Sequence, residues 1–162
     1  MPAITASQAG SQNRCAFLDA IATSEISAPL LAVTDNGYNV LVGSTVDDPL
    51  TFSSYAQHPN VYNAQMGSTA AGRYQILYRY WQVYQKLLNL PDFSPLSQDL
   101  YALQQFKERK ALALIDAGAF SAAITACNTI WASLPGSPYG QHTNSMADLQ
   151  AAYLAAGGTL AT

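Results

Sequence analysis

The chain has 162 residues, 49% of them hydrophobic and 10% charged, with a net charge of −3 at pH 7. This composition predicts one folded domain with a sizeable core and excludes a disordered chain. The acidic balance lacks the basic footprint of a nucleic-acid-binding protein, and no apolar run reaches the roughly 20 residues of a membrane helix, so we expect neither partner.

The first residues are small and polar, with no basic segment and no long apolar run. They lack the pattern of a signal peptide, so we expect the chain to be cytoplasmic when it is made. They predict a flexible extension over residues 1–12, followed by a single domain over residues 13–162.

The first helix is predicted over Asn13 to Ser24, and Glu25, one of only two glutamates, stands at its end. Leu18 and Ile21 lie three residues apart and Glu25 follows four later, so its carboxyl group continues the apolar stripe. Loss of water and the negative end of the helix dipole both raise a carboxyl pKa there. A raised pKa suits a general acid near neutral pH. The alternative is a helix-end glutamate that turns out to water.

A small sheet is predicted after this helix. Pro29 and Asp35-Asn36-Gly37 have turn chemistry, and the segment Tyr38–Gly43 is short, β-branched and aromatic, as is typical of a strand. After a turn at Asp47-Asp48-Pro49, the segment Leu50–Tyr55 is predicted to pair back as a second strand.

The remainder of the chain is predicted to be mostly helical. A long helix from Gly67 to about Leu88 is apolar over most of its circumference, so we expect it to be the central, largely buried helix. Shorter helices are expected over residues 94–110, 111–117, 121–133 and 145–156.

The cysteines and histidines give no metal-ligand spacing, so we expect no metal site. Cys127 shares an apolar stripe and predicts a buried, inert thiol, with a disulfide to Cys15 as the alternative. His58 and His142 each stand alone in the sequence.

A second stretch with the chemistry of a binding site begins at small residues. Ala70, Ala71 and Gly72 allow a ligand or a backbone to approach closely, and Arg73 and Gln75 offer donors to sugar hydroxyl and acetamido groups. The alternative is a contact between two helices.

Together with the glutamate-bearing helix, this stretch resembles the lambda-phage endolysin family of lytic transglycosylases, within the lysozyme superfamily. The matching runs occur in order between about residues 13 and 159. They include Ser24-Glu25, Asn36-Gly37-Tyr38, Gly72-Arg73-Tyr74-Gln75, Lys107-Glu108-Arg109, Ile130-Trp131-Ala132-Ser133-Leu134-Pro135-Gly136 and Tyr139-Gly140-Gln141.

The resemblance implies an α+β, lysozyme-like fold with a mostly helical lobe, a small antiparallel β-lobe and a glycan-binding cleft between them. It places the catalytic acid on Glu25 and makes Tyr74, Gln75, Tyr139 and Gln141 candidate sugar contacts. Each of the four has a structural alternative, and for Tyr74 that alternative is a place in the core.

The implied partner is the glycan strand of bacterial peptidoglycan, with no cofactor and with the protein as a monomer. The resemblance also implies dependence on a holin. The protein would stay in the host cytoplasm until the membrane is permeabilised, and would then reach the periplasm and cell wall.

Two departures from the family pattern bear on mechanism. Ile26 stands where the family has glycine, and Asn39 stands where it has aspartate. A lytic transglycosylase needs only one carboxyl group, because the muramyl C6 hydroxyl is its nucleophile, and Asn39 is then expected to bind the substrate acetamido group. A hydrolytic muramidase would need a second carboxyl, for which Asp47 and Asp48 are conceivable. A non-catalytic peptidoglycan-binding protein is the alternative from another class.

Overall fold

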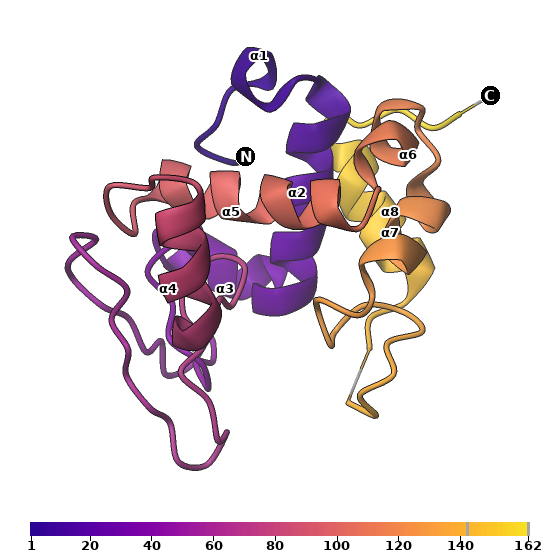
Figure 1. Ribbon diagram of the computed structural model, residues 1–162. Helices are drawn as coiled ribbons and strands as arrows, with labels where there is room; N and C mark the ends of the chain where they lie inside the picture. The colour runs from indigo at the N-terminus through magenta and orange to yellow at the C-terminus, as the bar shows by residue number, and fades with distance from the viewer. Residues whose placement is uncertain (142, 162) are drawn as a thin grey trace. The chain divides into compact units, whose positions relative to one another are not determined.

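The structure is a computed structural model that describes residues 1–141 and 143–161 (Figure 1). Its contacts divide the chain into two compact units. The terminal unit comprises Met1–Glu25 and Ala102–Thr162, and the central unit comprises Ile26–Tyr101. The prediction of a mostly helical chain is confirmed.

The N-terminal residues differ from the predicted flexible extension. Helix α1 (Ala6–Ala9) begins at a capping box in which the Thr5 side chain accepts from the Gln8 backbone and the Gln8 side chain accepts in return. Ile4 is 3% exposed, and the terminal ammonium of Met1 lies 3.3 Å from the carboxylate of Asp19. Sequence reasoning missed this helix because it is a single turn with one apolar anchor.

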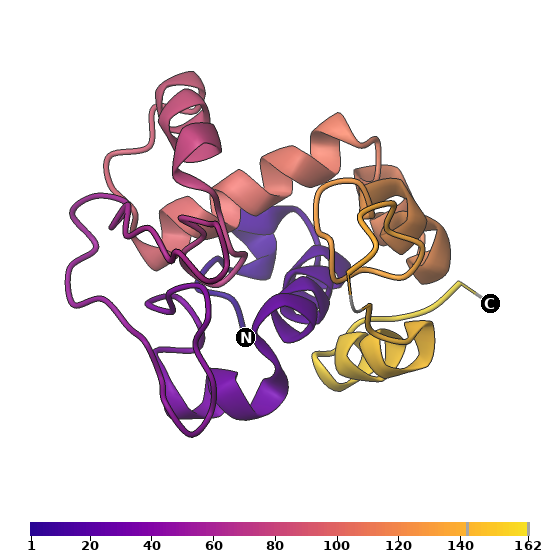
Figure 2. The ribbon, with the colours of Figure 1, turned by 90° about the horizontal axis from the view of Figure 1, so that it is seen from below.

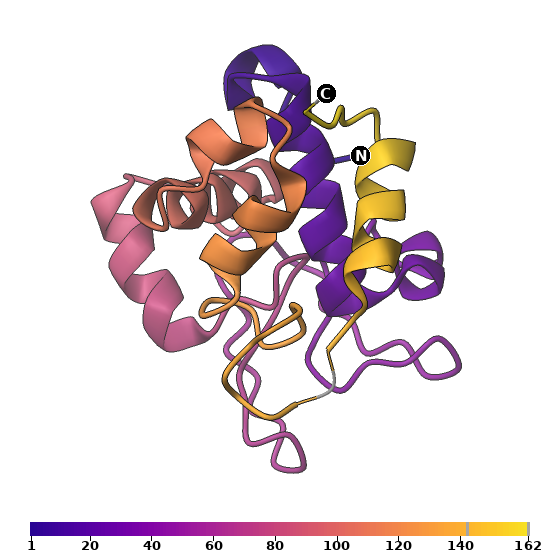
Figure 3. The same cartoon turned by 90° about the vertical axis from the view of Figure 1, so that its right-hand side faces the viewer.

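Helix α2 (Gln12–Ile26) is the central helix of the terminal unit. Residues 15–22 are all buried, Asp19 among them, so the middle of the helix is enclosed around its whole circumference. Phe17 packs edge-on against Phe106 and Phe120, with ring centroids 5.0 and 5.8 Å apart. Figure 3 shows α7 and α8 on either side of α2.

Four more helices occur at the predicted positions, three of them close to their predicted bounds. Helix α5 (Pro95–Glu108) is seen lengthwise in Figure 2. Helices α6 (Leu112–Asp116) and α8 (Met146–Ala155) are confirmed, and the Ser145 side chain caps α8. Helix α7 (Phe120–Cys127) ends six residues before its predicted end at Ser133, and turns occupy residues 128–130 and 132–133.

The prediction of a long buried helix from Gly67 to Leu88 is wrong. Only α4 (Tyr78–Leu87) is helical, and residues 67–77 form turns joined by isolated bridges. Gly72 has φ +77°, and a Cβ there would lie 2.2 Å from the Gln98 side chain, so this close approach requires glycine. Tertiary contacts of this kind override the helical pattern of the sequence.

Helix α4 is also more exposed than predicted. Val83 and Leu87 are each 60% exposed, whereas Trp81 is 1% exposed and packs against Phe93, with ring centroids 4.7 Å apart. Trp81 is the one buried residue of α4 and anchors the helix to the central unit, whereas Tyr80, Val83 and Leu87 lie at the surface.

The predicted two-stranded sheet is reduced to isolated antiparallel bridges among the described residues. Val40 pairs with Thr51, and Leu41 pairs with Ala71. The predicted partners do meet, since Leu41 N donates to Leu50 O at 2.8 Å, but no strand forms. The predicted antiparallel β-lobe is thus present only as single bridges.

Helix α3 (Ala28–Val33) was not predicted, because Pro29 suggested a loop. Proline at the second helical position removes an N–H that has no partner within the helix, so it is compatible with a helix start. Leu30 packs on Ile26 and Val40 and gives the helix its anchor.

Cys15 and Cys127 are buried free thiols, which confirms the inert-thiol interpretation over the disulfide. Burial raises the pKa of the Cys127 thiol to about 12, so it stays protonated at neutral pH. In the described residues, no helix is both long enough and apolar enough to cross a membrane.

Candidate active site

Glu25 lies in the last turn of α2, where its carboxyl group is partly buried. The Ser133 hydroxyl donates a hydrogen bond to Glu25 Oε1, and the Ser133 backbone also hydrogen-bonds the carboxyl group. Burial raises the pKa of the Glu25 carboxyl to about 7, while the bonds from Ser133 lower it. The group is therefore present in both protonation states near neutral pH, as an acid that later acts as a base requires.

The turn that follows Glu25 shows how the protein accommodates Ile26. The helix continues through Ile26, which is 5% exposed and packs on Leu30 and Val40. Ser27 then adopts φ +75° and separates α2 from α3. The conformation for which glycine is suited is thus taken one residue later by a serine, at some cost in backbone strain.

Two further side chains support Ser133. The hydroxyls of Ser24 and Ser133 are 2.7 Å apart, and Asn144 Nδ2 lies 3.0 Å from Ser24 Oγ. Sequence reasoning did not assign Ser24, Ser133 or Asn144 to the site. The signal available for Ser133 was its place inside the matching run of residues 130–136.

Ser133 is held by the segment in which it lies. Its neighbours Trp131 and Leu134 are 3% and 0% exposed, and Leu134 N donates to Trp131 O at 3.2 Å. Asn144 N donates to Ser133 O at 2.9 Å. Two buried neighbours and a backbone bond fix the position of the hydroxyl beside Glu25.

Other carboxyl groups with a resolved pKa change move in the opposite direction. Hydrogen bonds from Ser94 lower the pKa of Asp92, and hydrogen bonds from Arg14 lower that of Asp116. Asp47 and Asp48 are exposed in a turn, as predicted. Glu25 therefore differs from Asp92 and Asp116 in that its pKa is raised and theirs are lowered.

Tyr74 occupies the core alternative that the sequence left open. It is 1% exposed, and its hydroxyl donates to Asp99 Oδ1 at 2.6 Å. Tyr38 donates to the same oxygen at 2.8 Å. Burial raises the pKa of Tyr74 well above its usual value, so the hydroxyl remains a donor. We correct its assignment from a sugar contact to a support of the central unit.

Asn39 and Gln75 are partly exposed in the central unit. Asn39 Oδ1 accepts from Asp35 N at 3.1 Å, which leaves its amide nitrogen available. Gln75 has φ +46°, and its Nε2 donates to Gly72 O at 2.9 Å, which closes the turn. Both bonds fix local turns, and sugar contact by either residue stays a prediction.

Tyr139 and Gln141 are exposed and belong to the terminal unit, as does Glu25. The Tyr139 side chain is 56% exposed, although its hydroxyl donates to Thr129 O at 2.8 Å. That bond holds the ring in place while its face remains accessible. Their roles as sugar contacts stay predictions.

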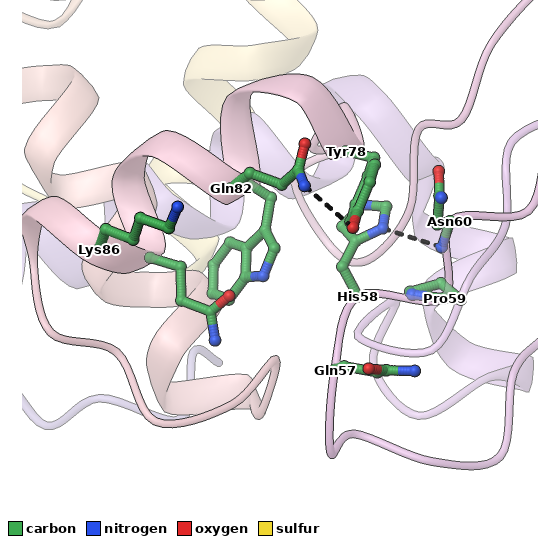
Figure 4. Close-up of a pocket in the computed structure, with 9 residues that line it drawn as sticks. Gln57, His58, Pro59, Asn60, Tyr78, Gln82 and Lys86 are labelled. Atoms are coloured by element: carbon green, nitrogen blue, oxygen red, sulfur yellow. Dashed lines mark hydrogen bonds between the residues drawn. The ribbon is translucent and has the colours of Figure 1, made fainter.

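A separate pocket of about 380 Å³ lies in the central unit, between residues 57–60 and one face of α4 (Figure 4). His58 fixes the segment, since its Nε2 faces Ile76 O at 2.8 Å and its Nδ1 accepts from Asn60 N at 3.0 Å. Burial lowers the His58 pKa, which favours this neutral form. The residues that line the pocket include no carboxylate and none of the predicted site residues, so we assign it no part in catalysis.

Within the described residues, no group of three or more His, Cys, Asp or Glu side chains is placed to hold a metal ion. His142, which the sequence left as an isolated histidine, lies outside the described residues.

Comparison with known proteins places the chain in a family. The Endolysin family model matches residues 15–160. The chain is 48% identical to the endolysin of Escherichia phage lambda over 151 residues, covering 91% of this chain and 92% of that protein. It is 46% identical to the endolysin of Escherichia phage P2 over 155 residues, covering 91% and 94%.

Solved structures agree with the sequence comparison. Bacteriophage lambda lysozyme complexed with a chitohexasaccharide matches with a TM-score of 0.84 and 45% identity, over 93% of this chain and 97% of that one. A second structure of lysozyme from bacteriophage lambda gives a TM-score of 0.81 at 44% identity over the same shares. The fold is therefore of the lambda-lysozyme type. The chain belongs to the endolysin family.

Proposed function

We propose that this protein cleaves the β-1,4 bond between N-acetylmuramic acid and N-acetylglucosamine in bacterial peptidoglycan, as a lytic transglycosylase. Membership of the endolysin family supports an enzyme that acts on peptidoglycan. The match to a lysozyme solved with a chitohexasaccharide supports a glycan substrate.

The observation that carries the proposal is the carboxyl group of Glu25, whose pKa burial raises to about 7. In the first step the neutral acid gives its proton to the glycosidic oxygen, the bond from that oxygen to the muramyl anomeric carbon breaks, and the oxygen keeps the electron pair. In the second step the carboxylate takes the proton of the muramyl C6 hydroxyl, and the C6 oxygen forms a bond to the anomeric carbon. The product end is 1,6-anhydromuramyl.

This route requires no second carboxylate. The attacking hydroxyl is already attached to the sugar, so the attack is intramolecular. Well-oriented intramolecular reactions reach effective molarities of about 10⁵ M or more, and no activated water is needed. Asn39, which replaces the family's aspartate, cannot act as a nucleophile or as a general base at neutral pH, and we assign it to binding the acetamido group. The sequence departure at this position therefore agrees with the one-carboxyl mechanism.

Digestion of purified peptidoglycan in water enriched in oxygen-18 tests the proposal. The transglycosylase forms anhydro ends, each lighter by one water than a hydrolysed end, and incorporates no solvent oxygen. Reducing N-acetylmuramic acid ends that carry oxygen-18 would establish the hydrolytic muramidase instead. Absence of any product from a folded protein would establish the non-catalytic binding protein.

The hydrolytic alternative assigns the second carboxyl group to Asp47 or Asp48. Both are exposed in a turn, and replacing the two together by asparagine is expected to change kcat/KM less than about twofold. The measurement is the loss of turbidity of purified peptidoglycan, and a loss of a hundredfold or more in kcat/KM would support the two-carboxylate mechanism.

We further infer that the enzyme acts late in host lysis, as a monomer. It would be made in the host cytoplasm and would reach the periplasm and cell wall after a holin permeabilises the membrane. Expression in a bacterial host with and without a holin tests this, since lysis is expected only when both are present. Lysis by the enzyme alone would contradict the dependence.

A further inference from the structure

The carboxyl group of Glu25 is the final acceptor in a chain of hydrogen bonds that runs from Asn144 through Ser24 and Ser133. Asn144 Nδ2 faces the carbonyl oxygens of Ser24 and Ser133 at 3.1 and 3.4 Å, and it also faces Ser24 Oγ. Carbonyl oxygens only accept, so the atom that faces them must be the amide nitrogen. The orientation of the Asn144 amide is thereby fixed, and its nitrogen is the first donor of the chain.

The direction then follows from the number of hydrogens available. Ser24 Oγ accepts from the Asn144 amide, and it donates its own hydrogen to Ser133 Oγ, 2.7 Å away, because the only hydrogen of the Ser133 hydroxyl goes to Glu25. The Ser133 hydrogen is in turn donated to Glu25 Oε1. Each hydroxyl accepts one bond and donates one, and such chains strengthen through mutual polarisation.

A donor fixed at Oε1 determines where the proton of neutral Glu25 resides. Because Oε1 already accepts from Ser133, a proton on that oxygen would oppose the hydroxyl hydrogen, and the proton is therefore on Oε2. We propose that Ser133, supported by Ser24 and Asn144, is a positioning residue that keeps the transferable proton of Glu25 on Oε2.

This inference rests on the proposed role of Glu25 as acid and base. In the first step the proton leaves Oε2 for the glycosidic oxygen, and in the second step Oε2 receives the proton of the C6 hydroxyl. The Ser133 hydrogen bond to Oε1 is kept throughout and strengthens when the carboxylate forms, because hydrogen bonds to charged acceptors are stronger. No side chain has to rotate between the two steps.

Four variants separate a positioning role from a structural one. Ser133→Ala removes the hydroxyl and retains the backbone bond to the carboxyl group, whereas Ser133→Thr retains the hydroxyl. Ser24→Ala removes the support but leaves Ser133 able to donate. Ser121→Ala, at an exposed serine of α7, is the matched control.

The decisive readout is the titration of the Glu25 carboxyl carbon by NMR, without substrate. The Ser133 hydrogen bond favours the carboxylate, so Ser133→Ala is expected to raise the titration midpoint by about one pH unit and to lower kcat/KM about tenfold. Ser133→Thr should restore both values, and Ser24→Ala should have a smaller effect. The double variant Ser24→Ala/Ser133→Ala should match Ser133→Ala, because the two residues act through one chain.

An unchanged midpoint in Ser133→Ala overturns the positioning role even if activity falls, since a purely structural serine would leave the carboxyl pKa in place. A loss in Ser24→Ala equal to or larger than that in Ser133→Ala also overturns it. The titration requires no turnover, so it decides this inference independently of whether the products bear anhydro ends.

Discussion

Two carboxyl groups, one in each unit, differ in how deeply they are buried and in the donors that surround them. Asp99 in the central unit is fully buried, and one of its oxygens accepts from the hydroxyls of both Tyr38 and Tyr74. Glu25 in the terminal unit is less deeply buried; burial raises its pKa, and the hydrogen bonds that oppose this rise come from Ser133. Hydrogen bonds from several donors stabilise a carboxylate and suit it to a structural role. A partly buried carboxyl group with few donors is able to exchange a proton.

The largest effect is expected from removing the carboxyl group of Glu25. Glu25→Gln keeps the shape and can still accept from Ser133, but it has no proton to transfer, so kcat/KM is expected to fall about 10³-fold or more. The measurement is turbidity loss of purified peptidoglycan. Retained turnover in a variant with unchanged circular dichroism would exclude Glu25 from catalysis.

The opposite outcome is expected for the structural carboxyl. Asp99→Asn weakens two hydroxyl bonds in the core of the central unit and should lower the free energy of unfolding by about 3 kcal/mol. Urea denaturation measures it, and activity per folded molecule should change little.

Asp35→Asn is the matched control, because Asp35 also accepts a tyrosine hydroxyl, from Tyr55, but is exposed. Its effect on unfolding is expected to stay below about 1 kcal/mol, since exposed pairs contribute little. Equal losses in the two variants would contradict the contrast between a buried and an exposed carboxylate.

A smaller effect is expected on the pH dependence of stability. The folded pKa of Glu25 is about 7 against 4.5 for the ordinary group, so the folded state binds more protons between these values and loses stability as pH rises through them. The full difference corresponds to about 3 kcal/mol, which partial exposure reduces to about 2 kcal/mol.

Glu25→Gln lacks this titration. Its free energy of unfolding relative to the unmodified protein is expected to be near zero at pH 4 and to rise to about +2 kcal/mol at pH 8. Chemical denaturation at the two pH values gives the difference. A difference independent of pH would show that the carboxyl titrates normally.

The site was predictable from the sequence where local pattern and function coincide. The position of Glu25 at the end of an apolar helix is a local property, and the structure places it there with a raised pKa. Ser133 and Asn144 lie more than 100 residues from Glu25 in the sequence and reach the site through tertiary contacts. A periodic pattern of residues does not predict such contacts.

The fold was predictable to a similar extent. Helices with their own caps and apolar stripes, such as α5 and α8, were found, whereas residues 67–77 resemble a helix in sequence and form turns. There the Gln98 side chain accepts from Arg73 N at 2.9 Å and lies against Gly72, so a distant residue decides the backbone conformation. The bridges formed by Val40 and Leu41 likewise depend on their pairing partners, which the sequence pattern alone does not identify.

The most direct test of the central claim is the titration of the Glu25 carboxyl group in the unmodified protein, followed by the NMR signal of its carboxyl carbon. A midpoint near pH 7 is the predicted result, because burial disfavours the charge more than Ser133 stabilises it. A midpoint near 4.5, the value of an ordinary glutamate, would contradict the account, since Glu25 would then hold almost no proton to transfer at neutral pH.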